Sequence, residues 1–108
     1  KVLFSNYEGC KTSEEMIGIL YKEAEILMGQ EGKVLVMANY EKSFGSNEYM
    51  DALKKISEEV LKNKIEKTAT LGITGVKEAL FKGYIFFSGQ KNVKLFYDKD
   101  EALEWLVE

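Results

Sequence analysis

Histidine and proline are both absent from this sequence of 108 residues. Histidine is the commonest general base and the usual partner of a serine or cysteine nucleophile, so its absence excludes catalytic triads of that kind. Proline inside a helix removes a hydrogen bond and bends the helix, so no helix of this chain carries a proline kink. The sequence therefore predicts regular helices and a protein that is not an enzyme.

Cysteine is represented by Cys10 alone, which excludes a disulfide within the chain. Unpaired cysteine is typical of a reducing cytoplasm. Structural zinc sites use about four cysteine or histidine ligands, so we expect neither a metal nor another cofactor. A reactive thiol needs a lowered pKa, and without a histidine partner we expect Cys10 to be structural.

Long apolar runs and blocks of like charge are also missing. No stretch reaches the roughly 18 apolar residues of a membrane span, and the start of the sequence lacks the pattern of a signal peptide. Fifteen basic and eighteen acidic residues give a net charge of -3, and they are interspersed along the chain. We therefore expect a cytoplasmic protein that neither spans a membrane nor binds nucleic acid.

The residues that are present alternate between short apolar or β-branched runs and longer amphipathic segments. This alternation is typical of βα units around a mostly parallel sheet. A hydrophobic share of 45% argues against disorder, and no break in composition divides the chain. The sequence predicts one α/β domain over residues 1–108, with four βα turns and a four-stranded sheet packed by helices.

Strands are predicted at residues 2–5, 34–38, 68–73 and 93–97, and helices at 13–28, 47–61, 75–89 and after Asp98. Thr12 with Glu15, and Asp98 with Glu101, have the spacing of a capping box, which marks a helix start. The helix over 13–28 has an apolar stripe, and its polar residues Lys22, Glu23 and Glu25 lie off that stripe. The helix over 47–61 has the pattern of a plain amphipathic helix.

The chain resembles the STAS-like, or SpoIIAA-like, superfamily, and within it small bacterial and archaeal domains. The resemblance rests on four βα turns in this length, on residues 71–77 and 87–89, and on the segments 95–98 and 101–106. It implies a SpoIIAA-like fold in a prokaryotic protein. It also implies a regulatory module that acts through protein interactions.

Two serines precede the second predicted helix. In the anti-sigma-factor antagonists of that superfamily, a serine at the start of this helix is phosphorylated, so the resemblance implies Ser43 or Ser46 as a phosphorylation site. The acidic residue that precedes the family's serine is missing here, where Lys42 stands. The alternative is that a serine caps the helix.

The turn before the third predicted helix is a candidate anion site. Free backbone N–H groups at a helix start attract anions, and Lys77 adds positive charge beside Thr74 and Gly75. No phosphate-binding loop or dinucleotide fingerprint accompanies them. The alternative is that Thr74 caps the helix and Gly75 serves the turn.

The third predicted helix is apolar around most of its circumference, because Phe81, Ile85 and Phe86 lie outside its main stripe. Such a helix is buried in its own chain, in part under the last helix with Trp105, or it offers a surface to a partner. We expect a protein partner or homodimer at these residues. A small anionic or lipid-like ligand, held there or near Thr74, is the alternative.

Overall fold

Four parallel strands form one sheet in the order β1-β2-β3-β4. The computed structural model describes residues 2–43, 46–88 and 92–108, with Val76 and residues 85–88 described by their backbone. The strands are β1 (Val2–Asn6), β2 (Val34–Asn39), β3 (Ile65–Leu71) and β4 (Val93–Phe96). The predicted α/β class and the parallel four-stranded sheet are therefore confirmed.

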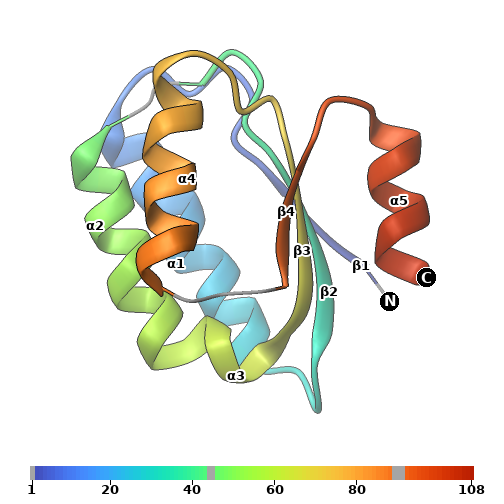
Figure 1. Cartoon of the computed structure of the whole chain (residues 1–108). Helices are drawn as coiled ribbons and strands as arrows, with labels where there is room; N and C mark the ends of the chain where they lie inside the picture. The colour runs from blue at the N-terminus through green and yellow to red at the C-terminus, as the bar shows by residue number, and fades with distance from the viewer. Residues whose placement is uncertain (1, 44–45, 89–91) are drawn as a thin grey trace.

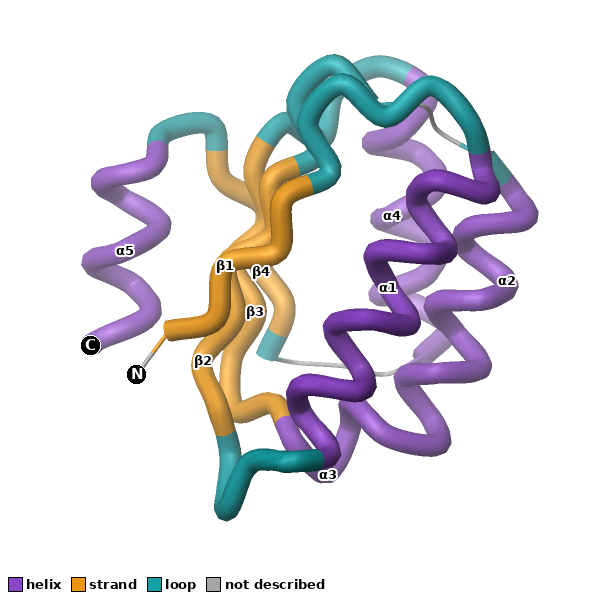
Figure 2. Tube along the Cα trace, turned by 180° about the vertical axis from the view of Figure 1, so that it is seen from behind, coloured by secondary structure: helices purple, strands orange, loops and turns teal. Residues whose placement is uncertain are grey.

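The helices cover the two faces of this sheet unequally. Its helices are α1 (Ser13–Met28), α2 (Asn47–Ile56), α3 (Lys62–Lys64), α4 (Val76–Ser88) and α5 (Lys99–Val107), with a π-helical segment, η1 (Ser57–Leu61), between α2 and α3. Figures 1 and 2 show α1, α2 and α4 side by side on one face and α5 on the other. We call these the three-helix face and the α5 face.

Side chains cap three of the helices at their first turns. Thr12 Oγ1 accepts the N–H of Glu15 at 3.2 Å, and Asp98 Oδ2 accepts the N–H of Glu101 at 3.3 Å. Ser46 Oγ accepts the N–H of Tyr49 at 3.1 Å at the start of α2. Each bond satisfies an N–H group that the helix itself leaves unpaired, so the capping predictions are confirmed.

The third strand differs from its prediction, because it begins three residues earlier, at Ile65, and ends at Leu71. Its polar start has partners, since Lys67 Nζ lies over the Trp105 ring at 5.0 Å from the centroid and donates to the Trp105 carbonyl at 3.0 Å. Gly72 follows the strand and has a φ of 78°. A Cβ there would lie 2.4 Å from the backbone nitrogen of Glu41, so only glycine fits.

Alternation along the strands divides the buried side chains between the two faces. The α5 face holds a small cluster of buried residues: Met37, Ala69, Leu71, Phe96, Ala102 and Leu106. The three-helix face holds the larger cluster, which contains Leu20, Leu27, Tyr40, Leu53 and Phe81 among others. The candidate functional site lies in this larger cluster.

The second helix is not the plain amphipathic helix that its pattern predicts. Residues 57–61 form one turn of π-helix between α2 and α3. Such wide turns are rare and occur often at functional sites. Ser57 and Leu61, the first and last residues of this turn, are both buried.

No helix in the described part of the chain is long and apolar enough to cross a membrane.

Candidate functional site

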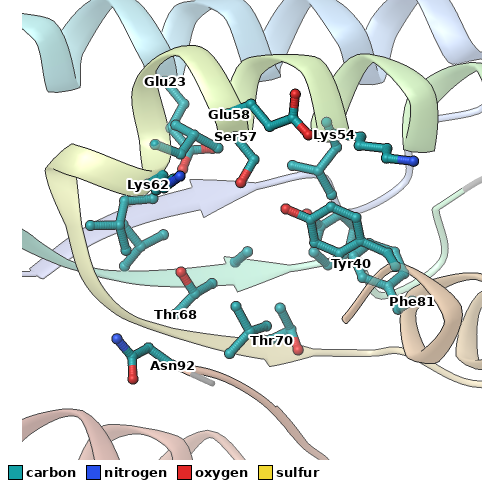
Figure 3. Close-up of a pocket in the computed structure, with 17 residues that line it drawn as sticks. Glu23, Tyr40, Lys54, Ser57, Glu58, Lys62, Thr68, Thr70, Phe81 and Asn92 are labelled. Atoms are coloured by element: carbon teal, nitrogen blue, oxygen red, sulfur yellow. The ribbon is translucent and has the colours of Figure 1, made fainter. Parts of the chain in front are cut away.

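A cavity of about 540 Å³ lies on the three-helix face, between the sheet and the helices α2 and α4. Its floor comes from β2 and β3, which contribute Val36, Ala38, Thr68 and Thr70. Leu53, Ser57 and Leu61 form its roof, and Phe81 and Tyr84 of α4 form one end. Figure 3 shows the helix above and the strands below this space. Most of the lining is therefore apolar or aromatic.

Two hydroxyl groups face each other across the cavity. Figure 3 shows the side chain of Ser57 pointing down from the π-helical turn and that of Thr68 pointing up from β3. Ser57 is buried, with 3% of its surface exposed. By contrast, Thr70 donates from Oγ1 to the Lys94 carbonyl at 3.0 Å, so its hydroxyl is committed to the sheet. Ser57 and Thr68 thus both bring a hydroxyl group to the cavity lining.

Charged residues line the lip of the cavity. Lys54, Glu58 and Lys62 follow one another at four-residue spacing along the roof helix, and all three are exposed. Residues at this spacing lie on one side of a helix. The lip therefore carries alternating charge in contact with solvent, while the interior does not.

The exception is Glu23 of α1, a carboxyl group that lines the cavity and is only 8% exposed. The hydroxyl of Tyr7 donates to its Oε2 at 3.3 Å, and Ser5 also bonds to the carboxyl group. Burial raises the pKa of Glu23 above its ordinary value, and the two hydrogen bonds oppose that rise. Glu23 is thus a buried acid whose charge is disfavoured by burial and favoured by its two hydrogen bonds.

Three buried tyrosines support Glu23 and the end of the cavity. The rings of Tyr7 and Tyr40 stack at 4.6 Å, and the hydroxyls of Tyr40 and Tyr49 lie 2.7 Å apart. The backbone N–H of Tyr7 donates to Asn39 and that of Tyr40 to Leu71, both at 2.8 Å, which fixes the two rings at the ends of β1 and β2. Burial raises the pKa of all three tyrosines well above the ordinary value, so they stay neutral.

The predicted anion site is partly committed to the fold. Thr74 and Gly75 are exposed before α4, and Gly75 has a φ of 61°, as its predicted turn role requires. Lys77 donates from Nζ to the carbonyl of Tyr40 at 2.8 Å. Burial lowers the pKa of this ammonium group, and Glu41 partly offsets the effect. Lys77 thus joins α4 to the end of β2, and anion binding stays a prediction.

The two serines before α2 have structural bonds. Ser43 Oγ donates to the Tyr40 carbonyl at 2.6 Å. Ser46 caps α2, and its Oγ also accepts from the hydroxyl of Ser13 at 2.9 Å. The capping alternative is therefore confirmed for Ser46, while phosphorylation of Ser43 or Ser46 stays a prediction.

The predicted interface residues are not all available to a partner. Phe81 is 4% exposed and packs edge-on against Tyr40, with ring centroids 4.8 Å apart. Of the two predicted alternatives, burial within the same chain therefore holds for Phe81. The side chains of Ile85 and Phe86 lie outside the described residues. The expected cover by Trp105 is wrong, because α5 lies on the opposite face of the sheet from α4 (Figure 1). Trp105 instead packs against Phe96 at 5.6 Å.

Glu23 is the residue that the sequence interpretation missed, since it was placed among the outward polar residues of its helix. Its spacing contained the signal: it lies three residues after Leu20 and four before Leu27, both fully buried. Positions at this spacing share a helix face. A glutamate is ordinarily assigned to the exposed side of a helix whatever its spacing, because carboxylates are seldom buried.

Cys10 is buried, and burial, followed by the nearby Glu15, raises the pKa of its thiol. A raised pKa keeps the thiol protonated and less nucleophilic, in keeping with a structural role. Within the described residues, no group of three or more cysteine and acidic side chains is placed to hold a metal ion.

Comparisons with known proteins do not assign the chain to a family. The resemblance to STAS-like domains accordingly stays a hypothesis about ancestry, and the site has to be interpreted from its own geometry. No protein-family model matches the chain, and neither a curated protein nor a solved structure matches it.

Proposed function

We propose that this protein binds a small, mainly apolar molecule in the cavity between the sheet and the helices α2 and α4. The observation that carries the proposal is a cavity of about 540 Å³ in which apolar and aromatic side chains form somewhat more than half of the lining and polar side chains the rest. Binding pockets for small molecules have volumes of roughly 300 to 1,000 Å³ and this same composition. The cavity is therefore of a size and chemistry that suit such a ligand.

The π-helical turn gives independent support. Ser57 begins this turn and lies at the cavity roof, and Leu61 at its end also lines the cavity. Wide turns persist where function offsets their cost. The hydroxyls of Ser57 and Thr68 then lie where a ligand would contact them, while the apolar lining supplies most of the affinity.

The proposed role is binding without catalysis. The sequence has no histidine to activate the hydroxyl of Ser57 or Thr68. A protein-interaction role remains a second hypothesis, but Phe81, one of its three predicted contact residues, is packed inside the chain. A ligand in the cavity would contact Phe81 directly.

Filling the cavity tests the proposal. We expect the uncharged dye Nile red to bind the purified protein with enhanced fluorescence, and Thr68→Phe to weaken that binding at least about ten-fold, because the new ring occupies the cavity. Thr74→Phe is the matched control, since Thr74 is exposed on a loop outside the cavity. Ala38→Leu is a second filling variant if Thr68→Phe does not fold, as judged by circular dichroism.

Equal dye binding by wild type, a folded filling variant and Thr74→Phe would overturn the proposal. So would a wild-type protein that does not bind the dye.

A further inference from the structure

We propose that the ligand carries an ammonium group that pairs with the carboxylate of Glu23. This inference rests on the proposed function and adds to it the chemical class of the ligand, an amine with an apolar body. Glu23 itself lines the cavity and is buried.

The hydrogen bonds to Glu23 prepare it for a negative charge. The hydroxyl of Tyr7 donates to Oε2 at 3.3 Å, and Ser5 bonds to the same carboxyl group. Donors of this kind stabilise the carboxylate rather than the neutral acid. The polar neighbours of Glu23 therefore favour ionisation, and burial opposes it.

What Glu23 lacks is a positive partner. Among the described residues, no lysine lies within 4.0 Å of the Glu23 carboxyl group. The ion pair found in that part of the chain joins Lys82 to Glu78 at 2.9 Å, on the surface of α4. An unpaired carboxylate in a buried position costs several kcal/mol, so burial favours the protonated form of Glu23 while no cation lies beside it. A ligand ammonium favours the carboxylate, and a proton held by Glu23 then leaves for the solvent.

The other groups that face this site fit a cation with an apolar body. Tyr7, Tyr40 and Tyr49 are neutral, because burial raises each pKa well above its ordinary value. The aromatic rings of Tyr40 and Phe81 line the cavity and offer surfaces on which an apolar or cationic group can lie.

The remaining charges stand on the lip, in solvent. Lys54, Glu58 and Lys62 line the cavity, but all three are exposed. Solvent and salt screen exposed charges far more than buried ones. The two lysines therefore repel an incoming amine weakly, and Glu58 between them offsets part of that repulsion.

A pair of probes of nearly equal size tests the inference. We expect 2-phenylethylamine to displace Nile red at about ten-fold lower concentration than 2-phenylethanol, because only the amine pairs with Glu23. In Glu23→Gln, which keeps an oxygen to accept from Tyr7, we expect the two probes to be equal. The anionic 3-phenylpropionate is the third probe, and it should displace the dye least.

The outcomes separate the two proposals. If wild type binds Nile red but the alcohol or the carboxylate competes as well as the amine, the ammonium inference fails and the binding cavity stands. If wild type does not bind the dye, the proposed function itself fails. A preference for the amine that persists undiminished in Glu23→Gln also overturns the assignment to Glu23.

The pH dependence in wild type keeps the inference testable if Glu23→Gln does not fold. Between about pH 4 and pH 8 the amine stays protonated and the alcohol neutral, so a change in their ratio must come from the protein. We expect the advantage of the amine over the alcohol to grow with pH, as Glu23 ionises. A ratio that is constant or falls with pH would contradict the pairing.

Discussion

The two faces of the sheet bury different kinds of side chain. On the α5 face, Phe96, Leu106 and their neighbours form a small apolar cluster. The buried polar side chains of the described residues, Ser5, Glu23, Ser57 and Thr70, instead belong to the three-helix face, where they bond to one another or line the cavity. One sheet thus has an apolar face that stabilises it and a face that combines a core with polar groups.

The comparison bears on where function resides. Burying an apolar side chain contributes roughly 1.5 to 3 kcal/mol, whereas burying a polar group is costly unless it is fully hydrogen-bonded. Proteins depart from the simplest stable arrangement mainly at functional sites. The buried acid, the wide helical turn and the cavity all lie on the three-helix face, so that face is where a ligand is expected.

The largest expected effect tests the α5 face. Leu106 is 2% exposed in its cluster, so Leu106→Ala should lower the free energy of unfolding by roughly 2 to 5 kcal/mol through the cavity it leaves. Urea denaturation followed by circular dichroism measures this. Nile red affinity of the folded variant should match that of wild type. A ten-fold loss of dye affinity would show that the two faces are not independent.

A smaller effect is expected at Glu23, in the dependence of stability on pH. Its pKa is raised in the folded protein above the ordinary 4.5, so the folded state holds the proton more tightly than the unfolded state. Stability from this group is therefore full below about pH 4.5 and is lost as pH rises through the folded-state pKa. Each unit of difference in pKa corresponds to about 1.4 kcal/mol.

Glu23→Gln should remove this loss, so its free energy of unfolding relative to wild type should rise between acidic and neutral pH. Urea denaturation at a series of pH values measures the difference. A difference that does not change with pH would mean that Glu23 has the same pKa in the folded and unfolded states. Tyr7 keeps an acceptor in the variant, so its hydroxyl does not complicate the result.

The smallest expected effects compare helix caps on the two faces. Ser46→Ala and Asp98→Ala should each lower the free energy of unfolding by about 1 kcal/mol. Ser46→Ala should cost more, because it also removes the acceptor of the Ser13 hydroxyl, at 2.9 Å in the wild-type protein. Urea denaturation of both variants in parallel decides the order. An equal or larger loss for Asp98→Ala would show that the bond to Ser13 adds no stability.

Much of the fold could be predicted from local patterns. The four strands, the helix starts at Thr12, Ser46 and Asp98, and the parallel sheet follow from periodicity and capping chemistry, which act over a few residues. The early start of β3 could not be predicted. The side chain that makes Lys67 acceptable in a strand is Trp105, and these residues are far apart in sequence.

Most of the candidate site could not be predicted from the sequence. The predicted site residues Ser46, Lys77 and Phe81 are all found in structural contacts, whereas the cavity is lined by residues that sequence patterns class as core or surface. Among the predicted site residues whose side chains the structure describes, Phe81 belongs to both groups. A cavity has no local sequence signature, because it is the space that several elements leave between them.

The chain's lack of histidine, its single cysteine and its alternating segments determined by themselves that it is an α/β protein without a histidine-dependent active site. Tertiary structure alone decided the strand order, the placement of α5 opposite the other helices, and the burial of Glu23. The physical reason is the separation along the chain of the residues that interact. Capping and periodicity act between neighbours in the chain, whereas the charge state of a buried acid depends on groups that only folding brings to it.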